Sequence, residues 1–194
     1  MPYLKSLILV GVLALFTALA VPVALGSSVH LKHGSSITCT VTSGTNSASV
    51  TCTGTGGLSG LGNSDVAFVL GGTGSATFNC MNPGNGNVVP GQNKVPFTAS
   101  PTTVTVGAGS IKNGNLDFFG PGGNTIGPST QSAPTPTAKQ VGCPSNSWTT
   151  TPTAVFFQTI DLAIQQPPDH TIIDCTAGTP NGPALTDTVT LTCS

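Results

Sequence analysis

Residues 37–53, ITCTVTSGTNSASVTCT, predict a β-hairpin, and this hairpin indicates the class of fold. Apolar and polar side chains alternate along both halves, as they do on strands that bury one face. A tight turn between the halves would place Val41 opposite Val50 and Cys39 opposite Cys52. Both pairs then lie on the apolar face, so the register of the two strands is strongly specified.

Short segments of the same kind recur along the rest of the chain. Strands are predicted at residues 65–70, 76–80, 95–99, 102–106, 116–119, 153–164, 170–175 and 186–193. The glycine- and proline-rich segments 54–62, 71–74 and 120–137 are predicted to be loops or turns. The longest predicted strand would place four apolar side chains on one face: Phe156, Ile160, Leu162 and Ile164. Residues 27–194 are therefore predicted to form a single all-β domain, an antiparallel, immunoglobulin-like β-sandwich stabilised by disulfides.

Residues 1–26 have the pattern of a signal peptide. Lys5 precedes a short apolar run at residues 7–19, and small residues follow it, so cleavage after Ala20 or after Gly26 fits. The alternative is an uncleaved anchor, but the run is short against the roughly 20 residues that span a bilayer. We therefore expect a mature protein without a membrane span that is secreted, extracellular or held at the cell surface.

The composition argues against a nucleic-acid partner. Charged residues make up only 6% of the chain, and it contains neither arginine nor glutamate. The lysines are too few to form a stripe that tracks phosphates, so we expect no nucleic-acid partner. Threonine, serine, asparagine, glutamine and glycine must instead form the polar surface.

The six cysteines all follow the predicted signal peptide, and an even number in an exported chain indicates three disulfides. The hairpin register pairs Cys39 with Cys52. For the other four we predict Cys80–Cys143 and Cys175–Cys193, although a tight turn at residues 181–182 would place Cys175 opposite Thr188 instead. A zinc site is the rival interpretation, and the absence of any Cys-x-x-Cys spacing argues against it.

Residues 77–93, TFNCMNPGNGNVVPGQN, combine a strand that ends near Cys80 with a long loop of asparagine, glycine and proline. One interpretation is a binding loop carried on a rigid sheet. The other is an ordered connection pinned by Cys80, because amides and glycines alone supply no catalytic chemistry. The only tryptophan follows Cys143 and would either pack on the core or stack on a sugar. The candidate binding residues are Trp148, Asn82, Asn85, Gln92 and Asn93.

Catalytic and metal-binding patterns are weak. Asp169 and His170 are adjacent, but no activated serine is identifiable beside them. Asp161 and Asp174 could form a carboxylate pair of the kind that glycosidases use, although nothing in the sequence singles them out. His30 and His33 lie in a segment expected to be frayed. We therefore expect no catalytic residue, no metal and no cofactor.

Several segments resemble a group of small exported bacterial proteins of unknown function. The resemblance is carried by residues 58–63 (LSGLGN), 80–85 (CMNPGN), 89–93 (VPGQN), 111–115 (IKNGN) and Cys143-Pro144 with Trp148. It covers most of the mature chain, and the PGQN stretch is its most specific part. It implies secretion and a β-rich domain, and it supplies no activity and no catalytic residues.

The sequence favours a secreted or cell-surface β-sandwich with a structural or interaction role and no catalytic activity. The first alternative is a carbohydrate- or ligand-binding module. The second is a hydrolase that uses Asp169 and His170. The expected partner is a cell-surface polymer or another surface protein.

Overall fold

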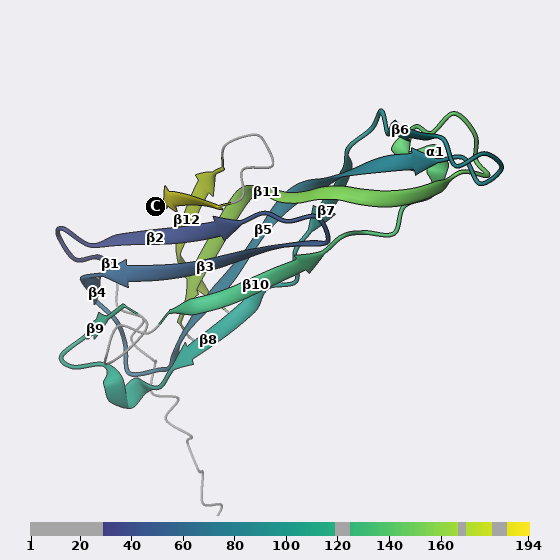
Figure 1. Ribbon diagram of the computed structural model, residues 1–194. Coiled ribbons are helices and arrows are strands. Elements are labelled where there is room, and N and C mark those ends of the chain that lie inside the picture. The colour runs from purple at the N-terminus through teal and green to yellow at the C-terminus, as the bar shows by residue number, and fades with distance from the viewer. Residues whose placement is uncertain (1–28, 119–124, 167–169, 180–185) are drawn as a thin grey trace, which may run out of the picture.

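The computed structural model describes residues 29–118, 125–166, 170–179 and 186–194. The predicted signal peptide lies outside these residues. The described chain is almost entirely antiparallel β-structure, arranged as two large sheets and one small sheet (Figure 1).

The first large sheet has four strands in the order β10-β3-β2-β13. Its members are β2 (Ser36–Thr42), β3 (Ser47–Thr55), β10 (Ile126–Ser132) and β13 (Thr186–Thr190). The predicted hairpin register is confirmed, because Cys39 pairs with Cys52 and Val41 with Val50. These four side chains are buried, which is the outcome that the alternation of apolar and polar residues predicts.

The second large sheet is built on two long strands, β5 (Val66–Met81) and β11 (Thr149–Gln165). On one side, β12 (Thr171–Gly178) pairs with β11, and β14 (Thr192–Cys193) pairs with β12. On the other side, three short strands pair in turn with β5: β6 (Val88–Pro90), β7 (Val95–Thr98) and β8 (Thr102–Val106).

A small sheet closes one end of the molecule. It contains β1 (His30–Leu31), β4 (Gly57–Ser59) and β9 (Asn115–Asp117) in the order β1-β4-β9. The 3-10 helix η1 (Ala108–Ser110) precedes β9, and the four-residue helix α1 (Ala138–Val141) lies at the other end of the molecule.

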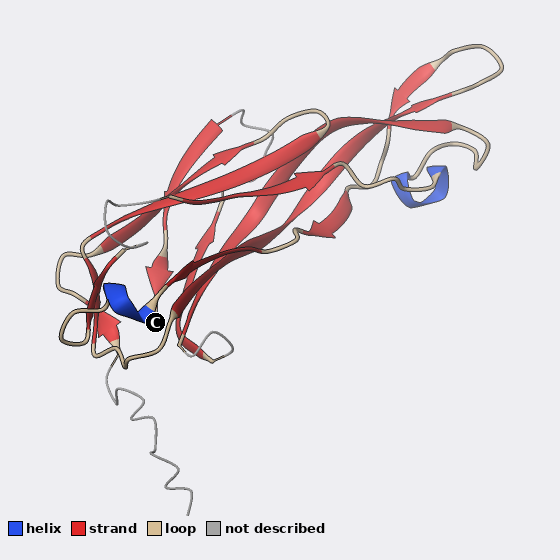
Figure 2. Cartoon of the chain, turned by 90° about the horizontal axis from the view of Figure 1, so that it is seen from below, coloured by secondary structure: helices blue, strands red, loops and turns tan. Residues whose placement is uncertain are grey.

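The two large sheets pack face to face around one core, so the predicted β-sandwich is confirmed. The core contains Cys39, Val50 and Ile126 from the smaller sheet, and it contains Phe68, Phe157 and Leu162 from the larger one. Figure 2 shows that the strands run along the length of an elongated molecule.

The β5–β11 ladder continues beyond the sandwich as an arm. Gly44, in the β2–β3 connection, forms a two-way backbone bridge with Val155, with N–O distances of 2.7 and 3.3 Å. Past Val155 the ladder runs on through residues 77–81 and 149–154, and β6 and α1 lie beside it (Figure 1). We call this part of the molecule, from residues 77 and 154 outward and including β6, α1 and their connections, the arm.

The turn predicted at residues 71–74 is wrong, because β5 passes through it without a break. The glycines there allow close approach of β11 rather than a change of direction. A Cβ on Gly72 would lie 2.3 Å from the carbonyl oxygen of Thr159, and one on Gly74 would lie 2.2 Å from that of Phe156. The register of the two strands also shifts between Phe157 and Thr159.

That shift corrects the predicted face of β11. Val155 and Phe157 join Ile160, Leu162 and Ile164 in the core, because the extra residue inverts the alternation. Phe156 is buried outside this cluster, and Nζ of Lys94 lies 5.4 Å from the centre of its ring.

Three predicted loops contain strands, and one of them is the long loop after Cys80, which contains β6. Residues 126–132 form β10 although they include Pro128, because β10 is an edge strand, where a missing backbone donor is tolerated. The segment 54–62 contains β4, and Leu58 in it is fully buried. The frayed segment expected around His30 is instead paired with β4 as β1.

The strand predicted at residues 186–193 is divided between the two large sheets. β13 pairs with β2, whereas β14 pairs with β12. Between them, the amide of Leu191 donates to the carbonyl oxygen of Ile37 at 2.9 Å, and its side chain enters the core. This crossing brings Cys193 directly opposite Cys175, a pairing that a tight turn at residues 181–182 would not give.

The structure contains the three predicted disulfides, Cys39–Cys52, Cys80–Cys143 and Cys175–Cys193. Cys39–Cys52 joins β2 and β3 within the four-stranded sheet, and Cys175–Cys193 joins β12 and β14 within the other large sheet. Cys80–Cys143 fastens the α1 segment to the end of β5. None of them crosses between the sheets as the disulfide of an antibody domain does. The immunoglobulin-like subclass is therefore not established by the strand order or by the bridges.

Candidate functional site

The tip of the arm gathers most of the binding residues predicted from the sequence. Met81 ends β5 and pairs with Thr149, the first residue of β11. The next residues outward are Asn82, directly after β5, and Trp148, directly before β11. Two segments far apart in the sequence thus meet at the tip because the long ladder is antiparallel.

An exposed apolar pair lies on one face of this tip. Met81 pairs directly with Val88 of β6, so the two side chains lie on the same face of the sheet. Met81 is 39% exposed and Val88 is 52% exposed. Among the described residues, these two are the large hydrophobic side chains that are exposed to solvent. The neighbouring pair, Cys80 and Val89, faces the other way and packs with the core.

The side chains of Asn82 and Asn85 stabilise the turn between β5 and β6. Oδ1 of Asn82 accepts from the amide of Gly84 at 2.9 Å, and Oδ1 of Asn85 accepts from the amide of Asn87 at 3.0 Å. Such bonds are typical of Asx turns, in which the side chain replaces a backbone acceptor. Both side chains are therefore engaged in the turn through their oxygen atoms.

Gln92 and Asn93 lie against the α1 segment. The backbone amide of Asn93 donates to the carbonyl oxygen of Val141 at 2.9 Å, and its Nδ2 donates to that of Gln140 at 3.2 Å. Gly91 fits closely there, since a Cβ on it would lie 2.2 Å from a methyl carbon of Val141. Both predicted binding residues are exposed, but Asn93 already has a structural role.

Trp148 is partly buried and packs against the hydrophobic core. Its backbone amide donates to Ser145 at 3.2 Å. The indole is therefore held beside the tip, and only part of its surface faces solvent. This position agrees with the packing role that the sequence left open, and it limits the area available for stacking on a sugar.

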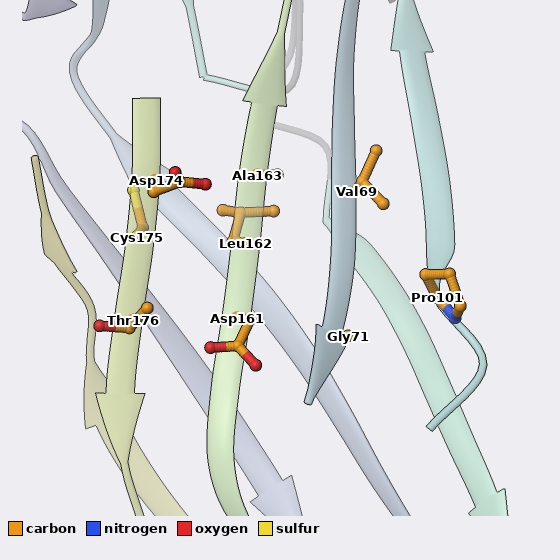
Figure 3. A pocket seen from close by; sticks show the side chains of 9 residues that line it. All are labelled: Val69, Gly71, Pro101, Asp161, Leu162, Ala163, Asp174, Cys175 and Thr176. Atoms are coloured by element: carbon orange, nitrogen blue, oxygen red, sulfur yellow. The ribbon is translucent and has the colours of Figure 1, made fainter. Parts of the chain in front are cut away.

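The second candidate site is a shallow depression of about 450 Å³ on the outer face of the larger sheet. Figure 3 shows Asp161 and Asp174 at its edge, with Val69, Ala163 and Pro101 around it. The carboxylates are diagonal neighbours on β11 and β12, because Asp161 pairs with Thr176 and Asp174 pairs with Ala163. The sequence offered these two residues as a possible carboxylate pair, and the register of β11 with β12 makes them neighbours.

This depression does not have the setting of a glycosidase acid–base pair. In such enzymes an apolar pocket keeps one carboxyl group protonated as the general acid. Here both aspartates are exposed on an open sheet. The arrangement offers two hydrogen-bond acceptors beside an apolar floor and no buried proton donor among the described lining residues.

The proposed hydrolytic pair cannot be assembled from the described residues, because Asp169 lies outside them. His170 is exposed, and its carbonyl oxygen accepts from the amide of Gln166 at 2.8 Å. Across the described part of the chain, no three histidine, cysteine or acidic side chains are grouped closely enough to hold a metal ion.

Sequence analysis missed the exposed Met81–Val88 pair. Each residue occurs in a segment that looks like an ordinary strand or loop, and only the register of β5 with β6 brings them together. No described helix has the length and apolar character needed to cross a membrane.

Comparison with protein-family models, curated proteins and solved structures found no match to this chain.

Proposed function

We propose that this protein is a secreted or cell-surface β-sandwich that acts by binding a partner through the tip of its arm, without catalysis. The observation that carries the proposal is the exposed pair formed by Met81 and Val88. Aromatic residues and methionine are enriched where proteins contact one another, and exposed apolar side chains gathered in one place mark such contacts.

The construction of the arm supports this role. A tip that binds must keep its shape, and here the Cys80–Cys143 disulfide joins β5 to the α1 segment. The ladder beneath the tip is continuous with the sandwich, which fixes the position of the tip relative to the body of the protein. Binding residues on such rigid supports lose little entropy when a partner arrives.

Export is part of the same proposal. Three disulfides are typical of proteins that reside in an oxidising compartment. The signal-peptide pattern of residues 1–26 points in the same direction. The partner is then another surface protein or a polymer of the cell surface.

A carbohydrate-binding module is the second candidate. It is favoured by the positions of Asn82 and the partly exposed Trp148, which are the sequence neighbours of the paired residues Met81 and Thr149 at the tip. Amide groups next to an aromatic ring can hydrogen-bond sugar hydroxyls and pack on the apolar face of a sugar.

The experiment compares the mature protein with Met81→Lys and Val88→Lys in binding to immobilised envelope proteins and envelope polysaccharides of the source cells. Thr40→Lys, on an exposed position of β2, is the matched control. We expect at least tenfold weaker binding for both tip variants and unchanged binding for the control. A partner that binds all four proteins equally would refute the tip as the contact surface.

Trp148→Ala separates the two candidates. Loss of binding to polysaccharide with this variant, while Met81→Lys still binds, would favour the carbohydrate-binding module. Loss of binding to a surface protein with Met81→Lys and Val88→Lys would favour the first proposal.

A further inference from the structure

The outer face of the four-stranded sheet carries a regular array of threonine and serine. Three of its strands contain the pattern Thr-x-Thr-x-Thr, at residues 38–42, 51–55 and 186–190. Cys39, Val41 and Cys52 lie between these threonines and are buried, so the alternation of the strands turns the threonines outward. Every outward position of β2, β3 and β13 is threonine or serine. We call these side chains, together with Thr130 of β10, the threonine face.

Strand pairing arranges the threonine face in rows. Thr188, Thr40 and Thr51 form one row, because Thr188 pairs with Thr40 and Thr40 pairs with Thr51. The next row contains Thr190, Thr38 and Thr53. Neighbouring strands lie about 4.8 Å apart, and alternate residues of one strand lie about 6.7 Å apart. The hydroxyl groups therefore form a two-dimensional grid.

This grid is rigid and open to solvent. Thr40, Thr53 and Thr188 are exposed, and their hydroxyl groups form no hydrogen bond with the described part of the chain. Branching at Cβ restricts the rotamers of threonine, which limits the positions of its hydroxyl and methyl groups. On the buried side of the same strands, the Cys39–Cys52 disulfide joins β2 to β3. A surface of this kind loses little entropy when it binds.

The chemistry of the threonine face narrows the class of ligand. The outward positions of β2, β3 and β13 have no charged and no aromatic side chain. A protein partner is disfavoured, because protein interfaces are enriched in aromatic residues, methionine and arginine and depleted in serine. A sugar is disfavoured, because the face has no aromatic ring to pack on it. Each hydroxyl gains little over its bond to water, so the ligand must engage many hydroxyls at once.

We propose that the threonine face binds ice. The surface of an ice crystal is an uncharged lattice that repeats in two dimensions, over distances comparable to those of the grid. Its water molecules donate and accept hydrogen bonds, as a threonine hydroxyl does. The threonine methyl groups leave little room for disordered water between the face and the lattice. This activity uses a different surface from the tip of the arm and does not depend on the partner proposed for the tip.

The test is partitioning of the mature protein into an ice crystal that grows slowly from dilute solution. We expect at least fivefold enrichment in the ice over an added carrier protein that does not bind ice. Thr40→Tyr places a bulky ring in the grid and keeps a residue that favours strands, so it should reduce the enrichment at least fivefold. Thr103→Tyr, at an exposed position of β8 in the other large sheet, is the matched control and should keep the enrichment.

Thr53→Tyr, in the neighbouring row, should repeat the loss, and an unchanged Tm identifies the variants that are folded. Exclusion of the mature protein from the ice would overturn the proposal, as would equal enrichment of Thr40→Tyr and Thr103→Tyr. Binding to insoluble polysaccharides that Thr40→Tyr abolishes, without enrichment in ice, would overturn it in favour of a polymer as the ligand. Met81→Lys should still enter the ice, and loss of its enrichment would contradict the assignment to the threonine face.

Discussion

Removal of the Cys80–Cys143 bridge should loosen the arm before it affects the sandwich. The two cysteines are 63 residues apart in the sequence, so on the chain-entropy model their link restricts the unfolded chain by about 4 kcal/mol. For a protein of this size we expect Cys80→Ala/Cys143→Ala to lower Tm by roughly 8–16 °C. The Cys39–Cys52 link, with a separation of 13, contributes about 3 kcal/mol on the same model.

A difference in Tm alone would not separate the two bridges, because Cys39 and Cys52 are also fully buried and their loss leaves cavities. The local effect does separate them. The amide of Asn93 is bonded to Val141 of α1, which the Cys80–Cys143 bridge fastens to β5. Its hydrogen exchange under native conditions should accelerate at least tenfold without this bridge.

The control is Cys39→Ala/Cys52→Ala, which should leave the opening of the arm unchanged at a temperature well below its Tm. Equal acceleration at Asn93 in both double variants would show that the arm opens only with the whole protein. No acceleration in Cys80→Ala/Cys143→Ala would show that hydrogen bonds and packing alone fix α1. Either result would refute the argument that the bridge holds the tip.

Three further predictions concern the body of the protein. Gly74→Ala should lower the free energy of unfolding in urea by more than about 2 kcal/mol, because the new Cβ would lie 2.2 Å from the carbonyl oxygen of Phe156. The control is Gly109→Ala, whose Cβ would meet no atom within 4 Å and which should change the free energy of unfolding by less than about 1 kcal/mol. Gln166→Ala should cost about 2–4 kcal/mol, because the buried side chain bonds both backbone groups of Gly62; a cost within error of zero would show that water replaces it. Raising NaCl from 0.05 to 0.5 M should shift Tm by less than about 2 °C, because the described residues contain one ion pair and it is exposed; a larger fall would reveal an ionic network.

Local patterns were sufficient to predict the hairpin of β2 and β3. Alternation of side chains placed Cys39 opposite Cys52, because a slip by one residue would turn the apolar face outward. The end of β5 at the arm could be predicted in the same way, because Asn82 and the residues after it favour a turn.

Pairing between distant segments could not be predicted from local patterns. The glycines at residues 71–74 indicated a turn, but their role is set by β11, which lies about 85 residues further along the chain. Pro128 argued against a strand, although it is acceptable on the edge where β10 lies. The crossing at Leu191 depends on β2 and β12 together, and neither is near it in the sequence.

In the candidate site, too, local composition could be predicted from the sequence, whereas pairing between segments could not. The residues around the tip were named from the unusual loop at residues 77–93, because its composition stands out from the strands. The exposed pair of Met81 and Val88 was not named, since its meaning arises from a register and not from either residue alone. The depression between Asp161 and Asp174 likewise depends on how β11 pairs with β12.

The role of the arm can be examined without choosing a variant in advance, by hydrogen-exchange footprinting of the mature protein with and without a solubilised envelope fraction of the source cells. If the tip binds the partner, protection will concentrate in the peptides that carry Met81, Val88 and Trp148. Protection of β11 and β12 around Asp161 and Asp174, with no change at the tip, would contradict the proposal that the tip binds the partner.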